Sequence, residues 1–224
     1  TKPGSKMSGS VFAKIMKTPK LLIFDVDGTI VDSFHHGFKN AKKLILRHTN
    51  EEITEDEYRD LIKGNPWENI FARAGLKTDD KMSLDSTEDF IDPYTDNKLF
   101  DEIKSLLKKF AKQFPMAIIT STFIPRIMEV FEREQIDAMF TAYMGPEVSI
   151  YKNIKLTMAM KEYGVAADEI LFVTDTVGDV AEAQKVNVPT VGVTWGFSTR
   201  EQLEEIKPDY LVGTVKELEE LILN

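Results

Sequence analysis

The stretch Leu21-Leu22-Ile23-Phe24-Asp25-Val26-Asp27-Gly28-Thr29 decides how the rest of the chain is interpreted. Four apolar residues of strand character end in two carboxylates one residue apart, and a glycine follows. A buried strand rarely ends in two acids that repel each other unless a cation lies beside them. Gly28 permits a turn directly after the pair, so that both side chains can line one crevice. The alternative interpretation is a strand that ends in a solvated acidic turn.

Length and composition limit the possible classes of protein. A chain of 224 residues suffices for one large domain, or for a domain of about 150 residues that carries a smaller insert. The net charge of -9 argues against a general nucleic-acid binder, whereas a local cation can still hold a small anion. The absence of cysteine excludes disulfides, thiolate nucleophiles and zinc-thiolate sites. No apolar run approaches the length of a membrane span, so we expect a cytoplasmic protein without a membrane partner.

From Leu21 onward, short apolar segments alternate with amphipathic ones. We expect strands over 20–25, 115–120, 169–174 and 190–194, with a weaker one over 209–212. Helices are expected over 98–113, 123–134, 154–163, 178–187, 199–206 and 214–223. This alternation predicts an α/β fold with a Rossmann-like parallel sheet and helices on both faces.

One region interrupts the alternation between the first and second strands. Phe34, Phe38, Ala41, Ile45 and His48 share one face of a first helix, and the pattern continues as helix without a strand. A crossover needs only a dozen or so residues, so we expect an inserted helical-bundle cap over 33–95. The core then comprises 20–32 and 96–224, after a tail over 1–19. Three further cap helices are expected: one opened by the capping box of Thr54 and Glu57, one beginning at Pro66 after Gly64-Asn65, and one near 79–91.

Polar residues follow three of the expected strands at the same end. Ligands of parallel sheets bind at the carboxyl ends of the strands, so these residues are expected to converge on one site. Oxygen ligands from carboxylates suit Mg²⁺, and Lys152 is the candidate for a second positive charge, with Asn153 expected to cap its helix. A solvated surface lysine is the alternative for position 152. The converging residues are Asp25 and Asp27, Thr120-Ser121-Thr122, and Asp175 with Asp179.

These elements together resemble the haloacid dehalogenase-like hydrolase superfamily from about Leu21 to Asn224. The helical insert resembles the cap of the branch that contains phosphoglycolate phosphatase and β-phosphoglucomutase, and the segments Val191–Phe197 and Pro208-Asp209 look most like the phosphoglycolate phosphatase side. Thr174 and Asn153 depart from the glycine and proline that are frequent at these positions. The first to fourth motifs are matched by Asp25-Val26-Asp27-Gly28-Thr29, Thr120-Ser121, Lys152, and Asp175-Thr176-Val177-Gly178-Asp179.

The resemblance implies a role for each matched residue. Asp25 would be the nucleophile and Asp27 the acid and base, while Lys152 and Thr120 would stabilise the phosphoryl group. Asp179 would orient Lys152 or a metal-bound water. The implied Mg²⁺ ligands are Asp25, Asp175 and the main-chain carbonyl of Asp27. The implied substrate contacts are Gly28, Thr29, Ser121, Thr122 and the cap residues Lys63 and Gly64.

Several aromatic and cationic residues near the site allow a plainer interpretation. Lys63 is either a partner for a substrate carboxylate or a solvated residue at a helix end. Trp67 is expected in the cap core, and His35 and His36 on the surface. Trp195 and Phe197 are expected to pack beneath the last site loop.

The function expected from these residues is a Mg²⁺-dependent phosphatase for a small phosphorylated metabolite, with phosphoglycolate as the named candidate. The chain would act as a monomer or homodimer, without a nucleic-acid partner. Three alternatives stay open: a phosphosugar mutase, a phosphatase of pyrophosphate or nucleotides, and an inactive hydrolase fold that serves as a binding protein.

Overall fold

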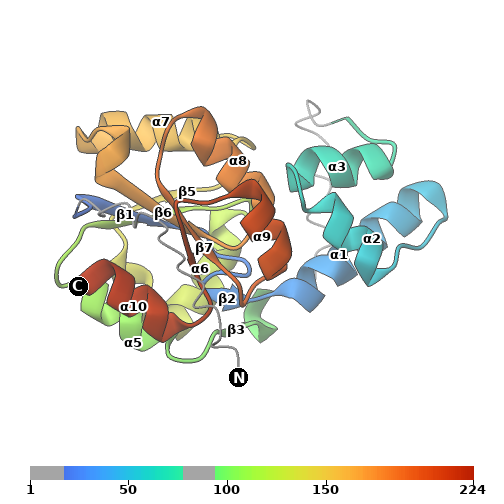
Figure 1. The fold of residues 1–224 in the computed structure, drawn as a ribbon. Coiled ribbons are helices and arrows are strands. Elements are labelled where there is room, and N and C mark those ends of the chain that lie inside the picture. The colour runs from blue at the N-terminus through green and yellow to red at the C-terminus, as the bar shows by residue number, and fades with distance from the viewer. Residues whose placement is uncertain (1–17, 78–93) are drawn as a thin grey trace, which may run out of the picture.

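The computed structural model of the chain describes residues 18–77 and 94–224 (Figure 1). Its centre is a fully parallel six-stranded sheet with the strand order β5-β4-β1-β6-β7-β8. This sheet confirms the predicted Rossmann-like α/β class. The strands are β1 (Leu21–Phe24), β4 (Met116–Ile119), β5 (Ala142–Met144), β6 (Ile170–Thr174), β7 (Thr190–Val193) and β8 (Tyr210–Val212).

Strand β1 lies between the two strands whose ends were expected to share its polar edge. Ile23 of β1 pairs with Ala117 of β4 on one side and with Phe172 of β6 on the other. Because the three strands are parallel, the residues that follow them reach the same edge of the sheet. The order of the strands therefore brings three polar segments of the sequence together.

Helices cover both faces of the sheet, because successive side chains of a strand point to opposite faces. Leu22 and Phe24 pack in the cluster that includes α5, α6 and α10, whereas Leu21 and Ile23 pack with α7 and α8. Figure 1 shows α7 and α8 on one side of the sheet and α5 and α10 on the other. The helices are α5 (Ile103–Phe110), α6 (Ile124–Arg133), α7 (Lys152–Tyr163), α8 (Val177–Lys185), α9 (Arg200–Ile206) and α10 (Val215–Leu223).

The segment 98–113 differs from the prediction of one continuous helix. Lys98–Leu99 forms the short strand β3, which pairs antiparallel with β2 (Val31–Asp32), and α5 begins only at Ile103. Strand pairing over such a sequence separation has no local signal, and here it overrides the helical spacing of the apolar residues. The edge strand β5 was also not predicted. Its three residues are too few to show an alternating pattern.

Three helices between β2 and residue 77 form a third hydrophobic cluster, and we call them the cap helices. They are α1 (Phe34–Thr49), α2 (Glu55–Leu61) and α3 (Pro66–Arg73). The predicted helix starts are confirmed: Thr54 and Glu57 form a capping box, and Asn65 caps α3 with Pro66 in its first turn. The predicted fourth helix near 79–91 and residues 1–17 of the predicted tail lie outside the described residues.

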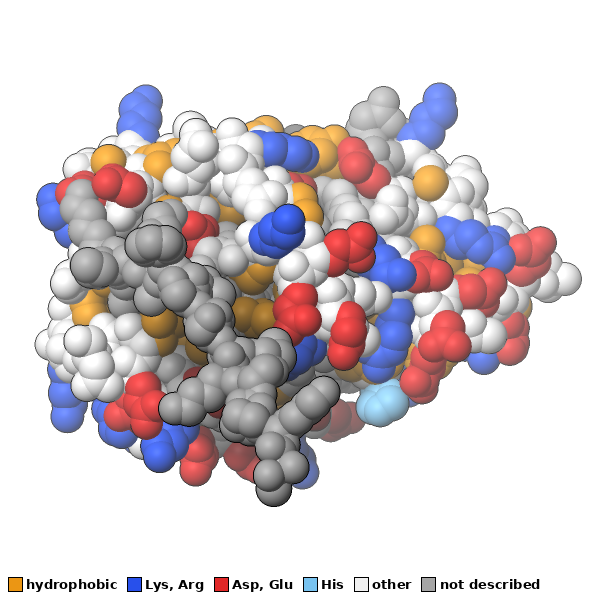
Figure 2. All heavy atoms as spheres, viewed as in Figure 1, with side chains coloured by type: hydrophobic (Ala, Val, Ile, Leu, Met, Phe, Trp, Pro, Cys, Tyr) orange, Lys and Arg blue, Asp and Glu red, His pale blue; other side chains and the backbone are white. Residues whose placement is uncertain are grey.

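The surface and the helix lengths add two observations. Acidic and basic side chains are interspersed over the face shown in Figure 2, among the side chains that it colours by type. Within residues 18–77 and 94–224, no helix combines the length and the apolar character that crossing a membrane requires.

Candidate active site

Asp25, the first residue after β1, is held next to the amino group of Lys152. Its Oδ1 lies 2.8 Å from Lys152 Nζ, and both residues are buried. The Asp25 N–H donates to the Val173 carbonyl of β6 at 2.9 Å, so the sheet fixes the backbone that carries the carboxylate. Lys152 Nζ also lies 2.5 Å from Asp179 Oδ2, which in turn accepts a hydrogen bond from the Thr174 hydroxyl at 2.6 Å. The structure thus brings Asp25, Lys152 and Asp179 together.

Burial and charge oppose each other in this group. Burial raises the pKa of Asp25 well above its ordinary value, the Lys152 charge opposes this rise, and the charges of Asp179, Asp175 and Asp27 add to it. Burial also lowers the pKa of Lys152, but the carboxylates of Asp179 and Asp25 outweigh burial and leave that pKa raised. Lys152 therefore stays positively charged, and the acidic side chains around it outnumber it.

Lys152 is the first residue of α7, and an acid from α8 fixes it there. Glu182 Oε2 accepts hydrogen bonds from the main-chain N–H groups of Lys152 and Asn153, the latter at 3.0 Å. The expectation that Asn153 caps this helix is wrong, because Asn153 lies inside it and Tyr151 is the N-cap residue. A carboxylate next to the first N–H groups of a helix is favourable, because these groups lack partners within the helix.

The Asp27 carboxylate accepts hydrogen bonds from three hydroxyl groups. Oδ1 accepts from Ser33 Oγ at 2.6 Å and from Tyr94 Oη at 2.7 Å, and Oδ2 accepts from Thr122 Oγ1 at 2.7 Å. Burial, followed by the nearby Asp27 charge, raises the pKa of Tyr94 well above its ordinary value, so this phenol stays a neutral donor. Ser33 directly precedes the cap helices, and Thr122 follows β4. Asp27 is therefore positioned jointly by the cap boundary and the sheet edge.

Asp175, directly after β6, is surrounded by close main-chain contacts. Its Oδ1 accepts from Thr29 Oγ1 at 3.0 Å, and its Oδ2 accepts from the Phe197 N–H at 2.7 Å. A Cβ atom added to Gly28 or Gly196 would lie only 2.1 Å or 2.3 Å from Asp175 Oδ2. Gly28 also has φ +79°, which disfavours any other residue. The two glycines are therefore required for the loops to enclose this carboxylate.

The donors around Asp25 and Asp175 fit a divalent cation of the magnesium type. Burial is the main reason that the pKa of Asp175 rises to about 7, and the pKa of Asp25 rises for the same reason. The positive charge near these two carboxylates is therefore too small to offset their burial. Among the described residues, the Asp27 carbonyl accepts no hydrogen bond, and no three acidic or histidine side chains are grouped as a metal site. Two carboxylates and one carbonyl suit Mg²⁺, which usually retains several waters.

The Thr120-Ser121-Thr122 turn after β4 is held from two directions. Thr120 is fully buried, its Oγ1 accepts from the Thr122 N–H at 3.0 Å, and its carbonyl accepts from Lys155 Nζ at 2.5 Å. On the cap side, Trp67 Nε1 donates to the Ser121 carbonyl at 2.9 Å. The turn is thus fixed by α7 beneath it and by α3 above it.

A cavity of about 190 Å³ lies between these strand ends and the cap helices. Six predicted site residues line it: Asp25, Asp27, Ser121, Thr122, Lys152 and Asp179. The cap helices contribute mainly apolar side chains, together with His36 and Asn40 of α1, and α6 contributes Arg126. The apolar residues of the cap wall include Ala41, Leu44, Ile62, Trp67, Ile70 and Phe71.

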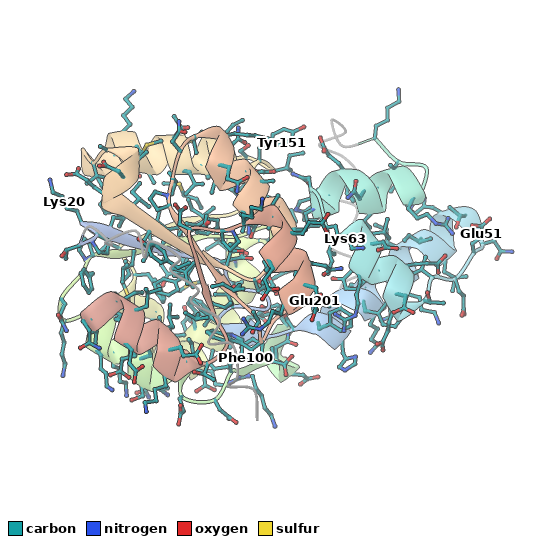
Figure 3. The ribbon with its side chains drawn as sticks, viewed as in Figure 1. Lys20, Glu51, Lys63, Phe100, Tyr151 and Glu201 are labelled. Carbon is teal, nitrogen blue, oxygen red and sulfur yellow. The ribbon has the colours of Figure 1, made fainter. Side chains whose placement is uncertain are left out.

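The other predicted site residues do not line this cavity. Lys63 Nζ pairs with Asp60 of the same helical turn instead, and its side chain is 44 % exposed. The main-chain carbonyl of Gly64 packs against Gly178 of α8, where an added Cβ atom would lie 2.4 Å from it. Figure 3 shows Lys63 beside the boundary between the cap helices and the core, across from Tyr151. Gly28, Thr29, Thr120 and Asp175 lie behind the cavity wall, where Thr29 supports Asp175.

The aromatic residues near the site agree only in part with the prediction. Trp67 contacts the Phe71 ring of the cap at 5.3 Å between centroids, but it also contacts Phe123 of the core at 5.7 Å. The prediction for Phe197 is wrong, because it packs against Phe34 of the cap at 5.4 Å and lines the cavity. Trp195 Nε1 donates to the Thr29 carbonyl at 3.2 Å. The indole of Trp67 therefore joins the cap to the core instead of only filling the cap.

The two histidines behave differently from each other. The His35 side chain is 83 % exposed, as predicted. The prediction of a surface position for His36 is wrong, because its ring packs against Tyr94 at 5.3 Å and lines the cavity. Residues on successive helix positions point in different directions, and without the cap's orientation the sequence does not decide which one faces the site.

Several residues at the site were not identified from the sequence. Ser33 and Tyr94 belong to no local motif, since they come from opposite ends of the cap segment. Lys155 and Glu182 were not singled out, although their spacing one turn after Lys152 and Asp179 was an available signal. Arg126 and Asn40 carried no signal of this kind.

Known proteins resemble this chain in sequence. The family model described as haloacid dehalogenase-like hydrolase matches residues 22–193, which is more than half of the chain. A phosphoglycolate phosphatase of Vibrio parahaemolyticus is 27% identical over 91% of this chain and 96% of its own length. A phosphoglycolate phosphatase of Photorhabdus laumondii is also 27% identical, over 92% of this chain and 93% of its own.

Solved structures share the fold. A crystal structure of a predicted phosphatase from Clostridium acetobutylicum superposes with a TM-score of 0.80 at 23% identity, and covers 92% of this chain and 99% of its own. One of a predicted phosphoglycolate phosphatase from Haemophilus somnus has a TM-score of 0.72 at 21% identity, over 88% and 94% of the two chains. At these identities the superpositions establish the fold, and the family model establishes the relationship. The chain therefore belongs to the haloacid dehalogenase-like hydrolase family.

Proposed function

We propose that the chain is a Mg²⁺-dependent phosphatase that hydrolyses a small phosphomonoester through an aspartyl-phosphate on Asp25. The observation that carries this proposal is the position of the Asp25 carboxylate, buried at the wall of the cavity with Lys152 Nζ 2.8 Å away. Asp27 lines the same cavity two residues further along the chain. The relatives described as phosphoglycolate phosphatases make phosphoglycolate the first substrate to test.

In the first step a carboxylate oxygen of Asp25 attacks phosphorus, and the bond from phosphorus to the leaving oxygen breaks. Asp27 enters this step protonated and gives its proton to the leaving oxygen, so that an alcohol departs. Lys152 and the hydrogen-bond donors of the Thr120-Ser121-Thr122 turn are suited to stabilise the phosphoryl oxygens, because they are fixed before the reaction begins.

In the second step water attacks the phosphorus of the aspartyl-phosphate, and Asp27 accepts the proton of that water. The phosphorus–oxygen bond to Asp25 breaks, which releases inorganic phosphate and restores the free carboxylate. The three hydroxyl donors around Asp27 hold its carboxylate in position for this step. A Mg²⁺ ion held by Asp25, Asp175 and the Asp27 carbonyl would supply positive charge to the phosphoryl group.

Substitution of the proposed nucleophile tests this function. We expect Asp25→Asn to lower the hydrolysis of phosphoglycolate and of a chromogenic phosphomonoester by a factor on the order of 10⁴ or more, because no covalent intermediate can form. Steady-state assays with Mg²⁺ measure the rate, and trapping of the phosphoenzyme with hydroxylamine detects the acyl-phosphate.

The matched control is Asp101→Asn, which changes an exposed aspartate that does not line the cavity and should leave the rate unchanged. Unchanged hydrolysis by the Asp25→Asn protein would exclude Asp25 as the nucleophile. Absence of hydrolysis by the wild-type protein for every phosphomonoester tried would exclude the phosphatase proposal as a whole.

A further inference from the structure

Lys155 is a buried amine to which the proposed reaction assigns no role. It lies one helical turn after Lys152 on the inner face of α7, and its side chain is 0 % exposed. Its neighbours on that face are Leu156 and Ala159, which pack in the hydrophobic cluster beneath the sheet. A lysine in such surroundings is unusual, because an ammonium group loses its hydration on burial.

The acceptor that the described residues offer to this amine is a main-chain carbonyl. Lys155 Nζ donates to the Thr120 carbonyl at 2.5 Å, and no side-chain carboxylate is bonded to it within the described residues. Burial, followed by the positive charge of Lys152, lowers the pKa of Lys155 to about 7, against the opposing effects of Asp179, Asp25 and Glu182. Burying a charge without an ion pair does not favour folding. Stability therefore does not explain why a lysine occupies this position.

The contact has a direct geometric consequence for the next residue. A trans peptide is planar, so the Ser121 N–H points away from the Thr120 carbonyl of the same peptide. Because that carbonyl faces Lys155 in the interior, the N–H is directed to the opposite side, and Ser121 lines the cavity. Among the described residues, no group accepts a hydrogen bond from this N–H. The donor is therefore available to a ligand in the cavity.

The lysine donor on the carbonyl also strengthens the N–H of the same peptide, most of all while the amine is protonated. Hydrogen bonds in a chain polarise one another, and a charge-assisted bond does so more strongly than a neutral one. The neighbouring peptide is held separately, because Trp67 Nε1 donates to the Ser121 carbonyl at 2.9 Å. With both carbonyls bonded, the peptide between Thr120 and Ser121 has little freedom to rotate.

We propose that Lys155 is a positioning residue for phosphoryl binding, which holds the Thr120–Ser121 peptide from beneath so that the Ser121 N–H faces the phosphoryl oxygens. This inference rests on the proposed phosphatase function, since it assigns the phosphoryl group to this side of the cavity. Lys155 acts through the peptide and does not itself line the cavity.

The test compares Lys155→Met with the wild type in activity, stability and the Ser121 amide signal. Methionine has nearly the length of lysine without its charge, so the packing is retained. Loss of a positioning contact of this kind typically reduces activity by about 10- to 100-fold, and we expect this reduction in kcat. The melting temperature should stay the same or rise, because a buried charge is removed.

The spectroscopic measurement is the change in the Ser121 amide proton shift on adding inorganic phosphate and Mg²⁺, in ¹⁵N-labelled protein. We expect a large downfield change in the wild type and a small one in Lys155→Met. Lys161→Met, at an exposed position of the same helix, is the matched control and should behave as the wild type. Lys155→Gln, which keeps a neutral donor on a chain one bond shorter, should lie between the wild type and Lys155→Met.

The outcomes separate the two proposals. Full activity and an unchanged Ser121 response in Lys155→Met would overturn the role of Lys155 while leaving the phosphatase intact. A fall in activity and melting temperature together, with a normal Ser121 response, would reduce Lys155 to a structural residue. An inactive wild-type protein would refute the phosphatase function itself.

Discussion

Three hydroxyl groups converge on Asp27, from residues that lie far apart in the sequence. Ser33 and Tyr94 donate to Oδ1, and Thr122 donates to Oδ2, so both carboxylate oxygens are held. Ser33 and Tyr94 come from the two ends of the cap segment, whereas Thr122 follows β4. The orientation of this carboxylate therefore depends on the cap segment and the core together.

Removal of one of these donors tests the positioning of Asp27 at the scale of a single atom. We expect Tyr94→Phe to lower kcat about tenfold, because a hydrogen bond to a charged group contributes roughly 1.5–3 kcal/mol and positions Asp27. Steady-state kinetics with a chromogenic phosphomonoester measures the change. Tyr163→Phe, which removes a hydroxyl bonded to Thr141 outside the cavity, should keep the wild-type rate. Equal rates for both variants would show that Tyr94 does not position Asp27.

The low pKa of Lys155 predicts a pH dependence of stability. The folded protein releases this proton above about pH 7, whereas the unfolded chain keeps it to about pH 10.4, so the unfolded state binds more protons in this window. Stability from this group therefore rises with pH between these values. We expect Lys155→Met to stabilise the protein more at pH 6.5 than at pH 9, by a difference on the order of 2 kcal/mol. Urea unfolding at both pH values measures it, and an equal gain at both would contradict the assignment.

At the scale of elements, the sequence predicted what depends on local pattern. Strands β1, β4, β6, β7 and β8 are short apolar runs bounded by polar residues, and the caps at Thr54 and Asn65 are local chemistry. The β2–β3 pair was missed because its partners are far apart in the sequence and each has two residues. Likewise, the strand ends indicated where Asp25, Asp27 and Asp175 converge, but nothing in the sequence placed Tyr94 or His36. The positions of these two residues depend on the orientation of the cap helices.

The contact between α8 and the turn after α2 offers a test at this scale. A Cβ atom at Gly178 would lie 2.4 Å from the Gly64 carbonyl oxygen and 3.1 Å from that of Lys63, both in the main chain. We expect Gly178→Ala to push this turn of the cap away from α8. This displacement should lower kcat/KM about tenfold, as is typical of a misplaced contact. The local helix should gain up to about 1 kcal/mol from alanine. Kinetics and thermal unfolding on the same sample separate the two effects, and an unaltered kcat/KM would show that the turn is not needed in this position.

At the scale of the whole molecule, the acid cluster links the proposed metal binding to stability. Burial is the main cause of the rise of the Asp175 pKa to about 7, so the metal-free folded state keeps a proton between about pH 4 and 7 that the unfolded state has lost. Stability from this group consequently falls as pH rises through that window. A cation needs the ionised form and competes with the proton.

We therefore expect Mg²⁺ to raise the melting temperature by several degrees at pH 8 and by much less at pH 5.5. Each kcal/mol of binding free energy should raise the melting temperature by about 2–4 °C. Differential scanning fluorimetry with Mg²⁺ or EDTA measures the shift. Asp175→Asn should lose it at both pH values. An equal shift at pH 5.5 and 8, or one that persists in Asp175→Asn, would place the cation elsewhere.

The β2–β3 pair has a consequence for how this molecule can be altered. Asp32 lies opposite Lys98, so the chain leaves the core and returns to it through neighbouring strands, which are about 5 Å apart. A tight turn spans that gap without moving β1 or α5. The intervening segment is therefore attached to the core at one narrow junction, and two of its residues, Ser33 and Tyr94, bind Asp27. A segment that is enlarged or grafted from a relative, and that keeps these two hydroxyl groups, can change selectivity while the chemistry at the sheet edge is conserved.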